Sequence, residues 1–186
     1  MVAITLVRHV ATAWTGSRYC GRSDPALDVA GVAAAGRLAD DLAPTLASGT
    51  RIVTSPLRRA WATAAAIASA AGIDGITIDD RWREADFGAA EGLTFEELER
   101  FAPDLARRLA DGETGIDWPD GERAEDLVVR VTVAWRDVVA SGDDVVVVSH
   151  AGPLRIAIGL ATGSPPGTVA LPGPGDVIRL PMTVPG

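Results

Sequence analysis

Short runs of β-branched residues alternate along this chain with longer stretches that are rich in alanine and leucine. Five runs have the length and composition of strands: residues 2–7, 50–55, 75–79, 143–149 and 175–182. The stretches between them predict helices over residues 28–46, 57–71, 94–108 with an interruption at Pro103, 122–140, and a last one that begins near Gly152 and includes residues 155–161. This alternation predicts an α/β fold with a mostly parallel sheet. No linker or repeat divides the chain, which indicates a single domain over residues 1–186.

The helix predicted after residues 50–55 has clear signals at both ends. Ser55 can cap its N-terminus, and Pro56 suits the first helical position because that position needs no backbone N–H donor. Gly72 can end the helix, since glycine readily adopts the left-handed conformation found there. The polar stretch over residues 111–122 predicts a long loop, which is either a mobile flap or a plain surface connection.

Charge and composition argue against several classes of protein. A formal net charge of -8 disfavours binding to nucleic acid, which usually requires a clustered basic face. The single Cys20 can form no internal disulfide and fits a reducing compartment, so a cytoplasmic location is expected. No signal peptide is expected, because the first apolar run is short and ends in Arg8. The valine run at residues 145–148 is far too short to span a bilayer, so no membrane partner is predicted.

Charged and imidazole side chains follow several of the predicted strands. Arg8 and His9 follow residues 2–7, Arg58 and Arg59 follow residues 50–55, Glu84 follows residues 75–79, and His150 follows residues 143–149. Ligand sites of parallel α/β sheets lie at the carboxyl ends of the strands. We therefore expect both histidines, one or two arginines and the glutamate to meet in one crevice.

Residues of these types together suit phosphoryl chemistry. Arginines and imidazoles can hold a dianion, and a neutral imidazole beside them can attack phosphorus. A carboxyl group that stays protonated can donate a proton to the leaving oxygen. Two other readings stay open: the histidines are structural, and Glu84 pairs with Arg81 or Arg83. A metal site is disfavoured, because the histidines lack the short paired spacing of common zinc motifs.

Four sequence motifs, in order, resemble those of the histidine phosphatase superfamily, which has the phosphoglycerate-mutase-like fold. The family patterns L-V-R-H-G-E-T-x-W-N, S-P-L-x-R-A-x-x-T-A, R-E-x-D-F-G-x-x-E-G and V-S-H-x-G are matched around His9, Arg59, Glu84 and His150. The stretch over residues 18–31 also resembles a family loop, with its proline shifted by one position, and the "RYCGRSD" part resembles the α-ribazole-phosphatase branch. The resemblance covers the whole chain and implies a three-layer sandwich with helices on both faces of the sheet.

The resemblance also implies roles for individual residues. His9 would be the nucleophile, Arg8 and Arg59 would hold the phosphoryl oxygens, His150 would be the second histidine of the pocket, and Glu84 would donate a proton and later activate water. Arg58 occupies the variable position x of the S-P-L-x-R pattern, so the resemblance assigns the binding of phosphoryl oxygens to Arg59. Weaker candidates for substrate contacts are Thr15, Gly21, Arg22 and the backbone at Ala151. No metal and no cofactor are implied.

Three residues depart from the family pattern, and they bear on turnover. Val10, Ala11 and Thr15 stand where the family has Gly, Glu and Asn. A stiff valine after the nucleophile is expected either to crowd the phosphate cradle or to pack into the core behind His9.

The predicted function is metal-independent hydrolysis of a small phosphorylated metabolite through a phosphohistidine. A catalytically weak or inactive phosphate-binding pseudoenzyme and a phosphoglycerate-type mutase are the alternatives. The expected partner is a small-molecule phosphate ester, and a homodimer stays open.

Overall fold

The computed structural model describes residues 2–182 and contains one five-stranded sheet in the order β3-β2-β4-β1-β5. The strands are β1 (Val2–Arg8), β2 (Arg51–Thr54), β3 (Thr77–Ile78), β4 (Val145–Ser149) and β5 (Val177–Met182). Neighbouring strands among the first four are parallel, and β5 pairs antiparallel with β1. The prediction of a mostly parallel sheet is confirmed.

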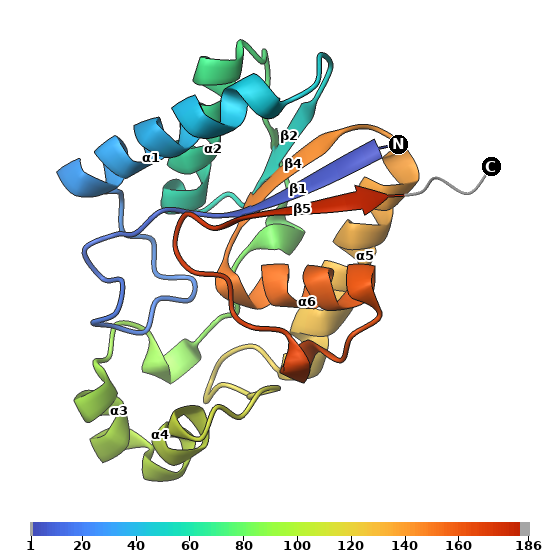
Figure 1. Cartoon of the computed structure of the whole chain (residues 1–186). Coiled ribbons are helices and arrows are strands. Elements are labelled where there is room, and N and C mark those ends of the chain that lie inside the picture. Colours follow the sequence, from blue (N-terminus) through green and yellow to red (C-terminus); the bar gives the residue numbers. More distant parts are fainter. Residues whose placement is uncertain (1, 183–186) are drawn as a thin grey trace.

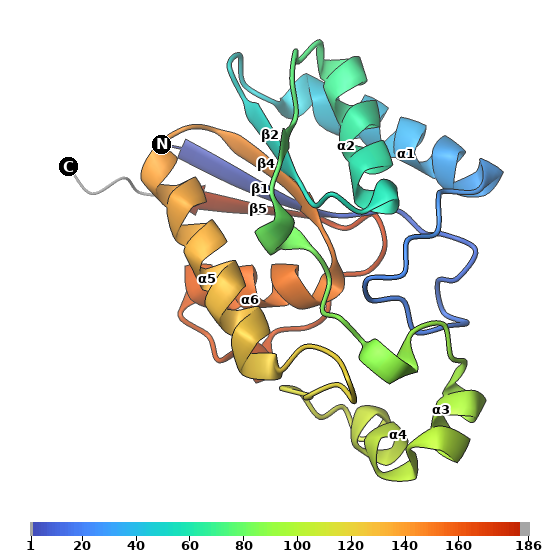
Figure 2. The ribbon, with the colours of Figure 1, turned by 180° about the vertical axis from the view of Figure 1, so that it is seen from behind.

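Helices cover both faces of this sheet and complete the predicted three layers (Figure 1 and Figure 2). On one face lie α1 (Val29–Leu42) and α2 (Arg58–Ala71), and on the other lie α5 (Ala124–Ser141) and α6 (Ala151–Thr162). The helices α3 (Phe95–Phe101) and α4 (Pro103–Ala110) lie away from the sheet, beyond the carboxyl ends of its parallel strands. The predicted interruption at Pro103 is the boundary between α3 and α4, because proline suits the first turn of a helix but not its interior.

Strand β4 shows why the sheet is buried on both faces. All five of its residues are buried, and successive side chains point to opposite faces. Val145 and Val147 pack with residues of α5 and α6, whereas Val146 and Val148 pack with residues of α1 and α2. An unbroken valine run is therefore the sequence that a central strand with two helical layers requires.

The start of α2 differs from the prediction. The N-cap position is Leu57 and no side chain caps the helix, so Ser55 is not its cap and Pro56 is not its first residue. The Ser55 hydroxyl instead accepts a hydrogen bond from the Leu57 amide (3.3 Å) and contacts a buried histidine described below. The predicted end is confirmed, since Gly72 has φ 62° in the left-handed region.

A third, smaller apolar cluster forms under α3 and α4, away from the sheet. Its buried members include Leu98, Leu105 and Ile116, and Trp118 packs against it. The loop over residues 111–122 contributes Ile116 and Trp118 and so is anchored in this cluster rather than lying only on the surface. None of the helices within residues 2–182 combines the length and the apolar character needed to cross a membrane.

Candidate active site

His9 lies at the carboxyl end of β1 and is buried, with 6% of its surface exposed. Its backbone amide continues the ladder to β4 by donating to the Ser149 carbonyl (3.0 Å). Its Nδ1 lies 2.7 Å from the Val10 carbonyl oxygen, which can only accept, so Nδ1 carries the proton. The Nε2 atom is therefore the unprotonated one, and its electron pair accepts a hydrogen bond from Arg59 Nε (3.2 Å).

The charge state of His9 follows from its surroundings. Burial, together with the nearby Arg59 guanidinium, lowers the pKa of His9 to about 3. The imidazole is consequently neutral at physiological pH, which is the form that can act as a nucleophile.

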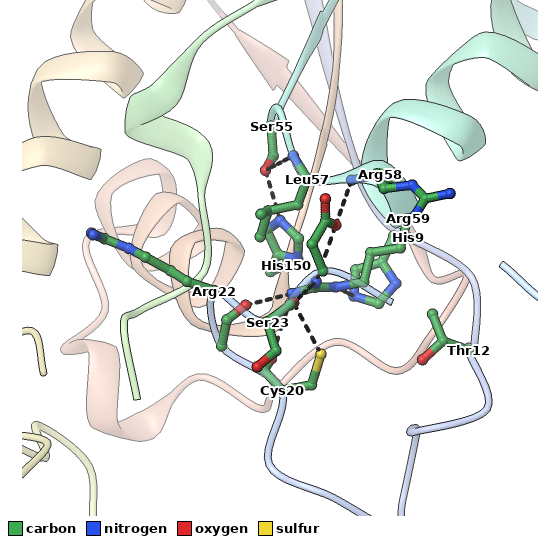
Figure 3. A network of polar contacts seen from close by, with 12 residues as sticks. His9, Thr12, Cys20, Arg22, Ser23, Ser55, Leu57, Arg58, Arg59 and His150 are labelled. Atoms are coloured by element: carbon green, nitrogen blue, oxygen red, sulfur yellow. Dashed lines mark hydrogen bonds and ion pairs between the residues drawn. The ribbon is translucent and has the colours of Figure 1, made fainter. Parts of the chain in front are cut away.

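His150 is fully buried at the carboxyl end of β4, directly before α6. Its ring centre lies 5.0 Å from that of His9, and its Nε2 lies 2.8 Å from the Ser55 hydroxyl oxygen (Figure 3). Burial, with a further contribution from His9, holds the pKa of His150 well below its usual value. The two histidines, 141 positions apart in the sequence, thus form one neutral pair.

Two buried nitrogen atoms of this group lack a hydrogen-bond partner. Within residues 2–182, three buried side-chain atoms have none, and two of them are Arg8 Nε and His150 Nδ1. Buried donors are nearly always satisfied in folded proteins, so two unsatisfied nitrogens around one imidazole indicate a ligand site. Both can donate to the oxygens of an anion.

Arg59 is held in place mainly by backbone carbonyls, with the Asp24 carboxylate at 4.0 Å. Its side chain is only 1% exposed, and it donates to the carbonyls of Ser23 (2.7 Å) and Gly21 (2.7 Å) as well as to His9. The guanidinium thus lies beside the His9 ring and is held mainly by uncharged groups. Arg58 is exposed, in accord with the assignment of the role to Arg59.

The loop that supplies those carbonyls is itself held by Glu91. Its carboxylate accepts hydrogen bonds from the backbone amides of Gly21 (3.2 Å), Arg22 (2.6 Å) and Ser23 (3.0 Å). A Cβ atom at Gly21 would lie 2.3 Å from the Ala85 carbonyl oxygen, so only glycine fits there. Sequence reasoning treated Glu91 only as part of a motif and missed this positioning contact.

Glu84 is buried on the other side of the group, with 7% of its surface exposed. Its carboxyl oxygens accept from the amides of Ala85 (3.0 Å) and Gly152 (3.3 Å). Burial raises the pKa of Glu84, and this favours the protonated acid. The alternative that Glu84 pairs with a neighbouring arginine is wrong, because Arg81 pairs with Asp79 and Asp137, and Arg83 pairs with Asp80.

Arg130 of α5 fixes the chain segment that carries Glu84. Its guanidinium donates to the carbonyls of Arg81 (2.7 Å), Arg83 (2.7 Å) and Glu84 (3.1 Å). The same group is bonded to the nearly buried Glu122 carboxylate (2.6 Å). The sequence showed Arg130 only as a polar position on an amphipathic helix and contained no signal for this contact.

The weaker candidates are placed in different ways. Gly21 contacts Arg59 through its carbonyl, and Ala151 is the first residue of α6, directly after His150. The side chain of Arg22 points away from His9 and makes ion pairs with acidic residues, Asp86 among them (Figure 3). Thr15 is exposed, and its hydroxyl accepts from the Thr12 amide (2.9 Å), which closes a turn. The structure therefore does not bring Thr15 and the Arg22 guanidinium to the histidine pair.

Gly152 lies where a side chain would collide with Glu84. A Cβ atom there would come 2.4 Å from Glu84 Oε1. We expect Gly152→Ala to displace the carboxyl group and to lower kcat for an alkyl phosphate roughly 10- to 100-fold. Steady-state kinetics should show a smaller loss for p-nitrophenyl phosphate. Gly36→Ala on α1, where the added atom meets nothing within 4 Å, is the matched control, and equal losses in both variants would contradict this explanation.

Val10 does not crowd a phosphate cradle. It is buried with 3% of its surface exposed, and its amide donates to the Thr63 hydroxyl (3.3 Å) rather than facing an open pocket. Its carbonyl holds His9 Nδ1, as described above. The structure thus favours the second expectation, in which valine packs behind the nucleophile.

Val10→Gly is therefore expected to lower the stability of the protein and not to improve catalysis. Loss of a buried side chain and gain of backbone freedom should lower the free energy of unfolding by about 2–4 kcal/mol. Urea denaturation measures this change, and kinetics should show kcat/KM falling because the Val10 carbonyl no longer orients His9 firmly. A rise in kcat/KM would restore the crowding explanation.

The strand ends of this α/β sheet bring together two histidines, a buried arginine and a buried carboxyl group whose pKa is raised, which defines a class of protein suited to phosphoryl groups. Residues 4–173 match the family model "Histidine phosphatase superfamily (branch 1)", and the chain belongs to this family. Within residues 2–182, no group of three or more His, Cys, Asp or Glu side chains could hold a metal ion.

Similar proteins include phosphatases and mutase-like proteins. The bifunctional protein Rv2228c of Mycobacterium tuberculosis is 37% identical over 161 residues, which are 85% of this chain, and the chain spans only 43% of the length of that relative. Phosphoglycerate mutase-like protein 4 of Arabidopsis thaliana is 31% identical over 156 residues, covering 82% of this chain and 67% of that protein. The native structure of mycobacterial glucosyl-3-phosphoglycerate phosphatase Rv2419c has a TM-score of 0.83 and 27% identity, over 96% of this chain and 89% of that one.

Proposed function

We propose that this protein hydrolyses a phosphate monoester of a small molecule through a phosphohistidine formed on His9, without a metal ion. The observation that carries the proposal is the state of His9: its Nδ1 is bonded to a carbonyl, so the unprotonated Nε2 faces Arg59, and its ring centre lies 5.0 Å from that of His150. An imidazole held in this way has its electron pair fixed in direction before the substrate arrives.

The first half of the reaction transfers the phosphoryl group to the protein. Arg8, Arg59 and His150 bind the phosphoryl oxygens, and Arg59 Nε turns from His9 Nε2 to one of these oxygens. The Nε2 electron pair, released in this way, attacks phosphorus as the bond to the leaving oxygen breaks. Glu84, whose pKa burial raises toward the acid form, gives its proton to that oxygen and releases an alcohol. The fixed guanidinium groups neutralise the charge on the oxygens, which is the task that a metal ion performs in other phosphatases.

The second half regenerates the protein. Glu84 is now a carboxylate and accepts a proton from water while that water attacks phosphorus. The phosphorus–nitrogen bond breaks, inorganic phosphate leaves, and Nε2 recovers its electron pair. Both oxygens of Glu84 accept from fixed amides, which keeps the same group in place for both proton transfers.

We favour an active phosphatase over an inactive phosphate-binding protein. Val10 and Ala11 are the departures that favour lost activity, but the Val10 carbonyl still orients His9 and the Val10 side chain is buried. A phosphoglycerate-type mutase remains the second candidate, because phosphoglycerate mutase-like protein 4 is among the relatives. Assays for the interconversion of phosphoglycerate isomers separate the two: a mutase keeps the phosphoryl group on the substrate, and a phosphatase releases it.

Release of phosphate from p-nitrophenyl phosphate by the purified protein tests the proposal directly. We expect turnover that is unchanged by EDTA, because arginines and imidazoles supply the positive charge. We also expect an acid-labile phosphoryl adduct after rapid quenching. Loss of activity in EDTA that a single divalent ion restores would contradict the metal-independent scheme, and no turnover with retained phosphate binding would favour the pseudoenzyme.

A further inference from the structure

A pocket of about 480 Å³ adjoins Glu84 on the side of α6 and the 113–118 segment. Glu84, Ala151 and Gly152 line one end of this pocket. Its volume falls within the range of pockets that hold small molecules. Because Glu84 is the proposed donor to the leaving oxygen, the alcohol part of the substrate must extend from this end of the pocket.

One wall of the pocket is aromatic. Phe87 and Trp118 are stacked, with ring centres 4.0 Å apart, and Tyr19 meets Trp118 edge-on at 6.0 Å. Aliphatic side chains, including Leu127 and Leu171, line other parts of the pocket. Aromatic and aliphatic surfaces of this kind gain most from covering an apolar ring, because both the ring and the wall leave water.

The pocket also contains one basic side chain. Arg155, one turn along α6 from Ala151, lines it and is half-buried. In the part of the chain that the structure describes, Arg155 makes no ion pair. Glu84 at the end of the pocket is the acidic group that acts on its charge, and both oxygens of Glu84 already accept from the Ala85 and Gly152 amides. Glu113, which also lines the pocket, is already bonded to Arg108 through both oxygens (2.8 and 2.6 Å). A carboxylate on the substrate would therefore supply the ion-pair partner for the Arg155 guanidinium.

We infer that the preferred substrates are phosphate esters of ring-bearing alcohols or phenols that also carry a carboxylate. The ring lies against Phe87 and Trp118, the carboxylate meets Arg155, and the ester oxygen lies next to Glu84. The inference rests on the proposed function, since it uses Glu84 as the proton donor. It goes beyond that function by naming the chemical class of the leaving group.

A matched pair of substrates tests the role of Arg155. The probes are 3-(4-phosphonooxyphenyl)propanoate and the corresponding propanamide, whose phenols differ little in leaving ability but differ in charge. We expect the wild-type protein to favour the carboxylate about tenfold or more in kcat/KM. Arg155→Gln should abolish this preference, whereas Arg37→Gln, an exposed position on the opposite face of the sheet, should leave it unchanged.

A second comparison tests the apolar wall. Trp118→Leu and Leu171→Ser should lower kcat/KM for phenyl phosphate several-fold and leave that for ethyl phosphate nearly unchanged. Leu171 is 57% exposed, so its replacement is not expected to prevent folding. Equal effects on the two esters would overturn the apolar part of the inference.

The outcomes separate this inference from the proposed function. Turnover of p-nitrophenyl phosphate with no preference for the carboxylate would overturn the inference alone. A preference that persists in Arg155→Gln would also overturn it. Failure to hydrolyse p-nitrophenyl phosphate under any condition would overturn the proposed function and, with it, the inference.

Discussion

His9→Ala is expected to remove phosphate release and phosphoryl labelling together, with a rate loss on the order of 10⁴-fold or more. The physical reason is that no other group can take over the attack. His150, the nearest imidazole at 5.0 Å between ring centres, is fully buried, and its Nε2 is bonded to the Ser55 hydroxyl. Water attacking the ester directly would lack the covalent step that divides one difficult displacement into two.

His9→Asn is a matched variant that separates chemistry from structure. Its amide nitrogen can still donate to the Val10 carbonyl, but it has no nucleophilic atom. We expect it to be as inactive as His9→Ala while keeping more of the stability and of the phosphate affinity. Rapid-quench labelling, thermal unfolding and phosphate titration measure these three properties. Retention of labelled protein in either variant would mean that another residue is the nucleophile.

Glu84→Gln is expected to slow the hydrolysis of alkyl phosphates by roughly 10²–10⁴-fold and that of p-nitrophenyl phosphate much less. An alkoxide is a poor leaving group and needs a proton, whereas nitrophenolate leaves without one. Glutamine nearly matches glutamate in size, and its amide oxygen can keep one of the two hydrogen bonds that the Ala85 and Gly152 amides donate to Glu84. Comparison of kcat for ethyl phosphate and p-nitrophenyl phosphate in the two proteins checks this expectation. The same fractional loss for both esters would mean that Glu84 has only a structural role.

The pH dependence gives a second measure of Glu84. Burial raises its pKa, so the acid form needed for the first step is present at low pH and is lost as pH rises through that pKa. The rate with alkyl phosphates should therefore fall as pH rises, and this fall should be absent in Glu84→Gln. The pKa of His9 lies at about 3, so its protonation should not lower the rate until the solution is strongly acidic.

The alternation of strands and helices was readable from the sequence because the signals are local. The period of apolar residues, the β-branched composition of the strands and terminators such as Gly72 and Pro103 act within one or two turns of the chain. The valine run of β4 also indicated a buried strand, and the structure shows that both of its faces are covered. The order of these elements in turn predicted that His9, Arg59 and His150 would lie near one another, since parallel strands end at one edge of the sheet.

Only the tertiary structure decided what holds those side chains in place, because the contacts join residues far apart in the chain. Ser55, expected as a helix cap, contacts His150 95 positions later. The Arg130 guanidinium binds carbonyls of the segment that carries Glu84, and the Glu91 carboxylate binds the loop around Gly21. Nearly every residue has the same backbone carbonyl and amide, so the sequence does not show which of these groups a distant side chain binds. The placement of Val10 was decided in the same way. Its backbone amide donates to the hydroxyl of Thr63, 53 residues later on α2, and its side chain is buried instead of facing a phosphate.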